Sequence, residues 1–357
     1  MNATLTVADI DHEWIRRRLG WPLGASEAIT VCAVSQSGGL MGGVYRVSCA
    51  GRSFVFKEPP DGGTQWGRLA LDTGLVAREV QLYRLLQSLR PPVPGITPAC
   101  HWSTLSAGGL GALALEDLGP SAPVGPVMAA GLTSPQADAA MRSLARAHAI
   151  LAAQGVDRPP PPYRWLYAAS SPGLIAAVRM GLDDLPRVAA ERWPENPMLR
   201  RLRRIVDIDV ESVLADAHSA HCLALCHGDA WAGNILFRPG GGGSQSVEAL
   251  LLDWQFAMWG NPLSDVALLL MSSLTPAARQ ASEDELLRRY HTALTTYWPV
   301  DYTLDACRDD LHRAEPAAAL VALASLEAYT SGMGNQELPR LAARVQTWLD
   351  RVASDRR

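Results

Sequence analysis

Two short apolar segments of the chain are each followed by side chains that can bind a cation or move a proton. The segment 223–226 leads into the run His-Gly-Asp-Ala-Trp-Ala-Gly-Asn, in which Asp229 precedes Asn234 by five residues, and the segment 247–252 leads directly into Asp253. Because Mg²⁺ prefers oxygen ligands and takes only a few of them from protein in nucleotide enzymes, Asn234 and Asp253 are candidate metal ligands. Asp229 is then available to orient a hydroxyl group and accept its proton. The alternative is a polar turn capped by its own side chains.

Lys57 is the only lysine among the 32 basic residues, and all the others are arginine. The planar fork of an arginine cannot replace a compact ammonium group on a flexible stem, so Lys57 is a candidate functional cation. It does not belong to a G-x-x-x-x-G-K-[ST] phosphate loop, because its context is Phe-Val-Phe-Lys. The alternative is a surface lysine retained by chance.

The pattern of apolar residues predicts the elements that position these side chains. We expect a first third rich in strands, followed by a mainly helical remainder, the two meeting near residue 117. Lys57 ends a predicted strand, and Asp229 and Asp253 each follow one. The predicted elements are helices at 7–19, 74–89 and 135–153, and strands at 29–34, 44–48, 53–57, 110–115, 223–226 and 247–252.

The motif H-G-D-x-x-x-x-N, followed by D-W and preceded by Lys57, resembles the aminoglycoside phosphotransferase and choline kinase-like family of the protein-kinase-like fold. The variant H-G-D-A-W-A-G-N with D-W-Q is most similar to the ecdysteroid kinase-like, CHK-type branch. The resemblance covers residues 30–270 and is weakest over 155–220. It implies a two-lobed α+β fold, with a small antiparallel-sheet N-lobe at 1–115, a hinge at 116–119 and a larger, mainly helical C-lobe at 120–357.

The resemblance also implies a role for each matching residue. Asp229 is expected to be the catalytic aspartate, Asn234 and Asp253 to hold Mg²⁺, and Lys57 to contact the phosphates of ATP. Glu79, on the predicted helix 74–89, is expected to pair with Lys57; alternatively, it is an exposed charge on the helix face. The other expected nucleotide contacts are a glycine turn over the phosphates and the hinge backbone, namely Gly38, Gly39, Gly42, Gly43, Glu116 and Leu118.

Departures from the protein-kinase pattern indicate a small substrate. Only the residues 254–264 separate Asp253 from Asp265, the residue that resembles the aspartate bracing the catalytic loop. This spacing leaves no room for a long activation segment, and Gly228 replaces the arginine that would bind a phosphate on such a segment. Two glycine pairs replace the spaced G-x-G-x-x-G, and Gln255 stands where many relatives have Glu or Gly.

These observations predict an ATP- and Mg²⁺-dependent phosphotransferase acting on a hydroxyl group of a small molecule, such as an amino sugar, an aminoglycoside-like or choline-like compound or another alcohol. The chemistry is expected in the cleft between the lobes. The alternative function is a nucleotide-binding pseudokinase that serves as an interaction scaffold. Eight acidic residues within 283–315 either line a site for a cationic acceptor or form a solvated helix face.

Three further side chains near these motifs are interpreted as structural. His227 is expected to anchor its loop through hydrogen bonds, His148 to be a packed helix histidine, and Trp231 to pack beneath the loop.

Composition and charge exclude other classes of protein. Hydrophobic residues make up 48% and charged residues 19% of the 357 residues, which supports a well-filled core. The net charge of −4 gives no reason to expect a nucleic acid or an anionic membrane as partner. The apolar stretch 317–326 is too short to span a bilayer, and the first residues do not resemble a secretory signal. Six cysteines without a C-x-x-C pair argue against a zinc site and suit a reducing cytoplasm.

Overall fold

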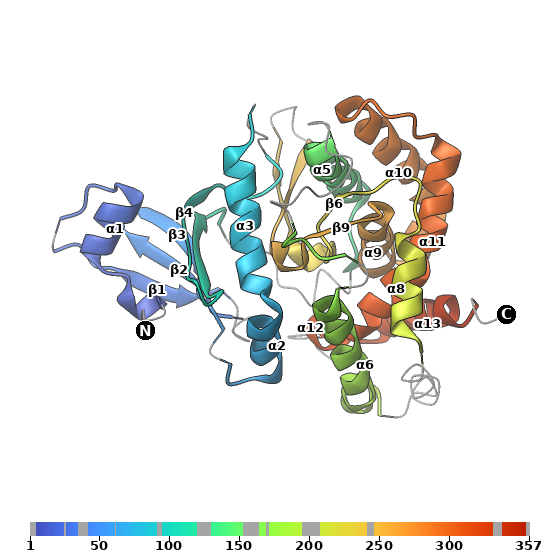
Figure 1. The fold of residues 1–357 in the computed structure, drawn as a ribbon, viewed down its shortest axis with the longest axis horizontal. Helices are drawn as coiled ribbons and strands as arrows, with labels where there is room; N and C mark the ends of the chain where they lie inside the picture. Colours follow the sequence, from blue (N-terminus) through green and yellow to red (C-terminus); the bar gives the residue numbers. More distant parts are fainter. Residues whose placement is uncertain are drawn as a thin grey trace. The chain divides into compact units, whose positions relative to one another are not determined.

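The chain divides into two compact units, Met1–Pro120 and Ser121–Arg357 (Figure 1). The first is built on a sheet, and the second is mainly helical. Within the described residues, no helix is both long and apolar enough to cross a membrane. The computed structural model describes residues 5–24, 26–34, 42–60, 62–90, 95–119, 130–152, 164–168, 171–194, 208–240, 246–330 and 338–354.

The first unit contains an antiparallel sheet with the strand order β1-β2-β3-β5-β4. The strands are β1 (Thr30–Ala33), β2 (Val44–Cys49), β3 (Arg52–Lys57), β4 (Cys100–Leu105) and β5 (Gly111–Glu116). A two-residue turn, Ala50-Gly51, joins β2 to β3, and both of its residues have positive φ angles (52° and 71°), as a tight hairpin requires. The turn sets the register in which Lys57 pairs with Val44. Lys57 therefore lies beside the residue that follows the predicted glycine turn.

Helices α1 (His12–Leu19) and α3 (Leu75–Ser88) pack on opposite faces of this sheet (Figure 1). The first unit also contains η1 (Val7–Asp9) and α2 (Gln65–Thr73), and α2 contacts α3. Because successive side chains of a strand point to opposite faces, Ala114 of β5 joins an apolar cluster with Ile15 of α1, whereas Leu113 joins a second cluster with Val80 of α3. This packing holds α3, which carries Glu79, against the sheet.

The prediction of one helix over 7–19 is wrong, because the segment is divided at Asp11. The carboxylate of Asp11 accepts a hydrogen bond from the backbone N–H of Trp14 (2.7 Å) and begins α1, which ends at Gly20. The short turn η1 precedes it and has a capping box of its own, formed by Thr6 and Asp9. Aspartate favours the capping position over the helix interior, which explains the division.

The second unit combines helices with two antiparallel strand pairs, β6 with β9 and β7 with β8. The strands are β6 (Ala224–Cys226), β7 (Ile235–Pro239), β8 (Val247–Leu251) and β9 (Met258–Gly260), and the 3-10 turns are η3 (Ala232–Asn234) and η4 (Trp254–Phe256). The helices are α5 (Ser134–Ala152), α6 (Pro172–Arg192), α8 (Val210–His218), α9 (Leu263–Ser273), α10 (Pro276–Tyr297), α11 (Leu304–Ala324), α12 (Leu326–Thr330) and α13 (Leu338–Ser354).

Helix α9 is enclosed by other helices. Every residue of α9 except Ser264 is buried, and the helix packs against α5, α10, α11 and α13 (Figure 1). A helix that is apolar on all sides must be surrounded by protein. Asp265, in its first turn, is therefore a carboxylate inside the core, and it needs hydrogen-bond donors to be stable there.

Gly181 lies where α6 contacts α11, so a substitution at this position tests the contact. A Cβ atom at this position would lie 2.2 Å from the backbone oxygen of Ala324. In a helix, alanine is normally more stable than glycine by about 1 kcal/mol. Here the added Cβ would collide with the backbone of Ala324, which cannot move aside as a flexible side chain could. We expect Gly181→Ala to lower the free energy of unfolding by about 1–3 kcal/mol in urea titrations. A variant at least as stable as the wild type would contradict this contact.

Candidate active site

The sole lysine forms a buried ion pair. The Nζ atom of Lys57 lies 2.8 Å from Oε1 and 2.7 Å from Oε2 of Glu79 on α3. The Glu79 side chain is only 1% exposed and that of Lys57 is 14% exposed. Glu79 is therefore not an exposed helix-face charge, and Lys57 is not a loose surface lysine. Because both carboxylate oxygens contact the ammonium group, the end of the lysine side chain has a defined position.

The predicted glycine turn is described only at its end. Gly38 and Gly39 lie outside the described residues. A Cβ atom on Gly42 would lie 2.7 Å from the backbone oxygen of Glu58, and one on Gly43 would lie 2.5 Å from the Glu58 carboxylate. The backbone N–H of Glu58 also donates to the carbonyl oxygen of Gly43 (3.0 Å). These two glycines therefore let the chain pass close to the residue that follows Lys57.

The predicted hinge is held by an arginine that the sequence analysis did not identify. Glu116 ends β5, and its backbone N–H donates to the carbonyl oxygen of Ala99 (2.7 Å). Arg46 of β2 donates two hydrogen bonds to the Asp117 carboxylate (2.7 and 3.1 Å) and one to the carbonyl oxygen of Gly119 (2.8 Å). A bidentate pair of this kind fixes orientation as well as distance. The backbone on both sides of Leu118 is thus held in place.

Asp229 and Asn234 are in direct contact in the loop that follows β6, which we call the HGD loop (227–234). The amide nitrogen of Asn234 donates to Oδ2 of Asp229 (2.8 Å) and to its carbonyl oxygen (3.0 Å). Asp229 is partly exposed. Burial and the nearby charge of Asp253 raise the pKa of Asp229 to about 7, against the effect of the Asn234 hydrogen bond.

Asp253 is brought to the same place by the hairpin of β7 and β8. Ile235 pairs with Leu251 in its register, and the backbone N–H of Leu252 donates to the carbonyl oxygen of Asn234 (2.8 Å). Asn234 is thus a partner in this contact, and Asp253 follows Leu252 directly in the chain. Asp253 has φ 61° and ψ 68°, a left-handed conformation that is uncommon for a residue other than glycine and is concentrated at functional sites.

The carboxylate of Asp265 braces the HGD loop through two hydrogen bonds. The two oxygens of this carboxylate accept hydrogen bonds from the backbone N–H groups of His227 (2.6 Å) and Gly228 (2.9 Å). The bracing contact expected from the resemblance is thus confirmed. Gly228 has φ 83°, and a Cβ atom there would lie 2.1 Å from the backbone oxygen of Phe256. Only glycine fits at this position, a reason for Gly228 that the sequence analysis did not identify.

His227 and Trp231 have the structural roles predicted for them. His227 is fully buried, its Nε2 donates to the carbonyl oxygen of Leu252 (2.8 Å), and its Nδ1 accepts from the backbone N–H of Asp229 (3.3 Å). Burial lowers the pKa of His227, which keeps the ring neutral in this arrangement. Trp231 is buried, and its ring centroid lies 4.4 Å from that of Tyr329.

The donor set fits a magnesium ion. The amide nitrogen of Asn234 is directed at Asp229, which leaves Oδ1 as the amide atom able to face a cation. Asp253 adds a carboxylate, so both candidate ligands are hard oxygens. The charge of Asp253 also contributes to the raised pKa of Asp229. Two carboxylates that repel each other in this way are a setting that a divalent cation would stabilise.

The acidic segment 283–315 is largely neutralised by arginines. The ion pairs are Glu283–Arg279, Asp284–Arg288, Asp284–Arg308, Glu285–Arg288, Glu285–Arg289, Asp305–Arg308, Glu315–Arg279 and Glu315–Arg351. Asp310 is buried and accepts hydrogen bonds from Tyr302 and His221. Apart from the buried Asp310 and Glu315, the acidic residues support the interpretation as a solvated helix face, and the ion pairs argue against a wall built to receive a cationic acceptor.

An apolar cavity of about 50 Å³ adjoins Gly228 of the HGD loop and Asp265 of α9, with α6, α8 and α11 on its other sides. Sites for small molecules typically have about 300–1,000 Å³. The cavity is therefore too small to receive a sugar or a comparable acceptor.

Comparison with known proteins shows what the chain is similar to. No curated protein matches it. Among solved structures, ethanolamine kinase of Plasmodium vivax is 10% identical, with a TM-score of 0.51 over 90% of this chain and 81% of that chain. A candidate aminoglycoside phosphotransferase of Ralstonia eutropha is 12% identical, with a TM-score of 0.50 over 96% of this chain and 97% of that chain.

These likenesses confirm the predicted two-lobed, protein-kinase-like α+β fold. The model of the ecdysteroid kinase-like family matches residues 46–298, which is well over half of the chain and includes Lys57, the HGD loop and Asp253. The chain is therefore a member of the ecdysteroid kinase-like family.

Proposed function

We propose that this protein transfers the γ-phosphoryl group of ATP to a hydroxyl group of a small molecule. The observation that carries the proposal is the contact of Asp229 with Asn234, next to Asp253, on a loop braced from the protein core. Membership of a kinase-like family supports the same class of reaction. The short link from Asp253 to Asp265, which contains only η4, β9 and the start of α9, favours a small acceptor over a protein.

The proposed roles follow from the contacts of each side chain. Asp229 would accept the proton of the acceptor hydroxyl while the new O–P bond forms and ADP leaves. Asn234 holds the Asp229 carboxylate in one orientation, which aligns the acceptor oxygen for in-line attack. Lys57, positioned by Glu79, would contact the phosphates. Mg²⁺, held by Asn234 and Asp253, would neutralise charge on the nucleotide.

The nucleotide contacts in the first unit remain part of the proposal. The glycine turn, with Gly42 and Gly43 at its described end, would cover the phosphates, and the backbone at Glu116 and Leu118 would contact adenine. The presence of Lys57 together with the HGD loop argues against a pseudokinase scaffold. We also place the activity in the reducing cytoplasm, because all six cysteines are free thiols.

Asp229→Asn tests the proposed base. The amide keeps the shape of the side chain but cannot accept the hydroxyl proton. We expect kcat to fall by about 10²–10⁴-fold, measured as ADP release in a screen of hydroxyl compounds. Stabilisation by ATP with Mg²⁺ should persist, at about 2.7 kcal/mol when the ligand is at 100 Kd. Asp309→Asn makes the same chemical change at an exposed site and is the matched control. Near-full turnover by Asp229→Asn would refute the assignment.

Lys57→Arg tests whether an ammonium group is needed. The substitution keeps the charge and follows the arginine bias of the chain, but the wider planar group cannot occupy the same place between Glu79 and a phosphate. We expect kcat/KM for ATP to fall by about tenfold or more. Arg16→Lys, at an exposed position, is the control for arginine–lysine exchange. If Lys57→Arg retains full kcat/KM, the lysine is not required and the proposed phosphate contact is wrong.

A further inference from the structure

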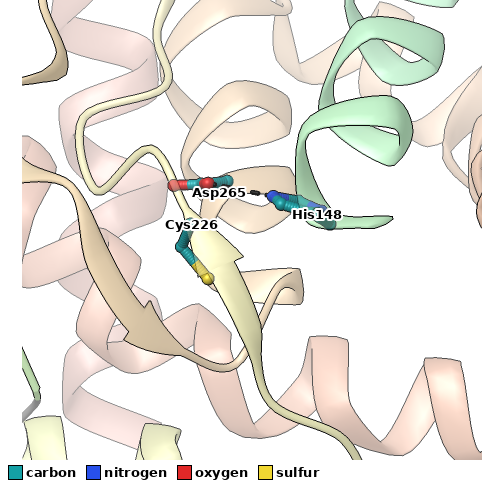
Figure 2. Close-up of side chains that lie close together, drawn as sticks. All are labelled: His148, Cys226 and Asp265. Carbon is teal, nitrogen blue, oxygen red and sulfur yellow. Dashed lines mark hydrogen bonds and ion pairs between the residues drawn. The ribbon is translucent and has the colours of Figure 1, made fainter. Parts of the chain in front are cut away.

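Beneath the HGD loop, three buried side chains from three elements lie close together (Figure 2). They are His148 of α5, Cys226 of β6 and Asp265 of α9, and their potential ligand atoms lie within 4.8 Å of one another. The Cys226 thiol donates to backbone oxygens, and burial raises its pKa well above its ordinary value, so it stays protonated. Both oxygens of Asp265 accept backbone N–H groups. Cys226 and Asp265 are thus already engaged with backbone groups, and of these three side chains only His148 and Asp265 are hydrogen-bonded to each other.

His148 joins this network through both ring nitrogens. Its Nε2 lies 3.0 Å from Oδ2 of Asp265 and therefore carries a proton, because a carboxylate can only accept. Its Nδ1 lies 2.7 Å from the hydroxyl of Tyr290 on α10. Burial raises the pKa of Tyr290 well above its ordinary value, so this hydroxyl keeps its proton and can donate to Nδ1. Tyr290, His148 and Asp265 therefore form a continuous series of hydrogen bonds, which ends at the backbone N–H groups of the HGD loop.

We propose that His148, supported by Tyr290, is a positioning residue for phosphoryl transfer, because it holds the Asp265 carboxylate in the orientation that fixes the backbone of His227 and Gly228. His148 touches none of the proposed reacting groups and acts through Asp265. Asp229 follows Gly228 directly, so a shift of the Gly228 backbone would also shift Asp229, the proposed base. This role rests on the proposed function only for its effect on turnover.

The burial of Asp265 shows why the ring N–H of His148 is needed as a third hydrogen-bond donor, beside the backbone N–H groups of His227 and Gly228. His148 is 0% exposed, Tyr290 0% and Asp265 2%. Burial opposes the charge on Asp265, whereas hydrogen bonds from His148 and His227 lower the pKa of this carboxyl below its ordinary value. Removing the His148 N–H leaves two backbone donors for a buried anion. The carboxylate must then turn or bind a proton, and either change weakens its hold on the loop.

Three variants separate positioning from packing. In His148→Gln, the amide group can donate to Asp265 and accept from Tyr290. In His148→Leu, the volume stays similar but both hydrogen bonds are lost. Leu151→Ala removes a fully buried apolar side chain from the same helix and is the control for lost stability alone. Each variant is first tested for folding by circular dichroism and thermal unfolding.

Hydrogen exchange is the first readout, because it needs neither an acceptor nor turnover. We expect His148→Leu to speed exchange of the His227 and Gly228 amides by about tenfold or more relative to the amides of the β7–β8 hairpin. His148→Gln should stay within about threefold of the wild type, and Leu151→Ala should show no selective effect at the HGD loop. Unchanged exchange in folded His148→Leu would overturn the proposal, whether or not an acceptor is known.

Turnover is the second readout and links the network to the reaction. ADP release with Mg²⁺–ATP should have a kcat lowered by about tenfold or more in His148→Leu, with KM for ATP within about threefold, and His148→Gln should recover most of it. A kcat loss that follows melting temperature in all variants, Leu151→Ala included, would contradict positioning. If His148→Leu does not fold, Tyr290→Phe is tested in its place by hydrogen exchange. Exchange of the His227 and Gly228 amides that is faster by about threefold than in the wild type supports the positioning role of His148, and unchanged exchange rejects it.

Discussion

The buried carboxylate of Asp265 is the constraint on which the second unit depends. An anion inside an apolar helix bundle is unstable unless donors surround it. Asp265 obtains them from the backbone of His227 and Gly228 and from the ring of His148, all of which lie far from it in the sequence. The need to satisfy one charge therefore ties α9, α5 and the HGD loop together, and it does so next to Asp229.

Local backbone geometry adds further restraints on the HGD loop and on Asp253. Gly228 lets the loop pass within contact of the Phe256 backbone, and the left-handed conformation of Asp253 turns the backbone out of the β8 direction. The β7–β8 hairpin supplies the remaining restraint, because its register sets Asn234 and Asp253 at one end. In the first unit, the pair of Lys57 with Glu79 is an equivalent local restraint. In each unit, the group to which we assign a chemical role is held by a partner that itself belongs to regular structure.

Local sequence patterns predicted a large part of this architecture. The elements whose bounds were predicted, except the helix at 7–19, lie within a residue or two of those bounds, because apolar periodicity and proline positions are local signals. The edge strand β4 was not predicted, since its sequence Cys-His-Trp-Ser-Thr-Leu alternates between apolar and polar residues over only four positions. The division at Asp11 was missed because a capping aspartate inside an apolar pattern resembles an exposed helix residue.

Contacts between distant residues were beyond the reach of such patterns. The resemblance to a known family suggested that Glu79 pairs with Lys57, and the pair is observed. The clamp of Arg46 on Asp117 had no comparable signal, because nothing in the sequence connects two residues 71 positions apart. His148 was interpreted as a packed histidine and is indeed buried, but its hydrogen bond to Asp265, 117 positions away, depends on the packing of α5 against α9.

A crystal structure with Mg²⁺ and a non-hydrolysable ATP analogue tests the central claim most directly. We predict a cation about 2.0–2.1 Å from Oδ1 of Asn234 and from a carboxylate oxygen of Asp253. The terminal phosphate should lie on the same cation, with the HGD loop still hydrogen-bonded to Asp265. A cation bound to other residues, or a nucleotide that leaves Asn234 and Asp253 without a metal, would contradict the account.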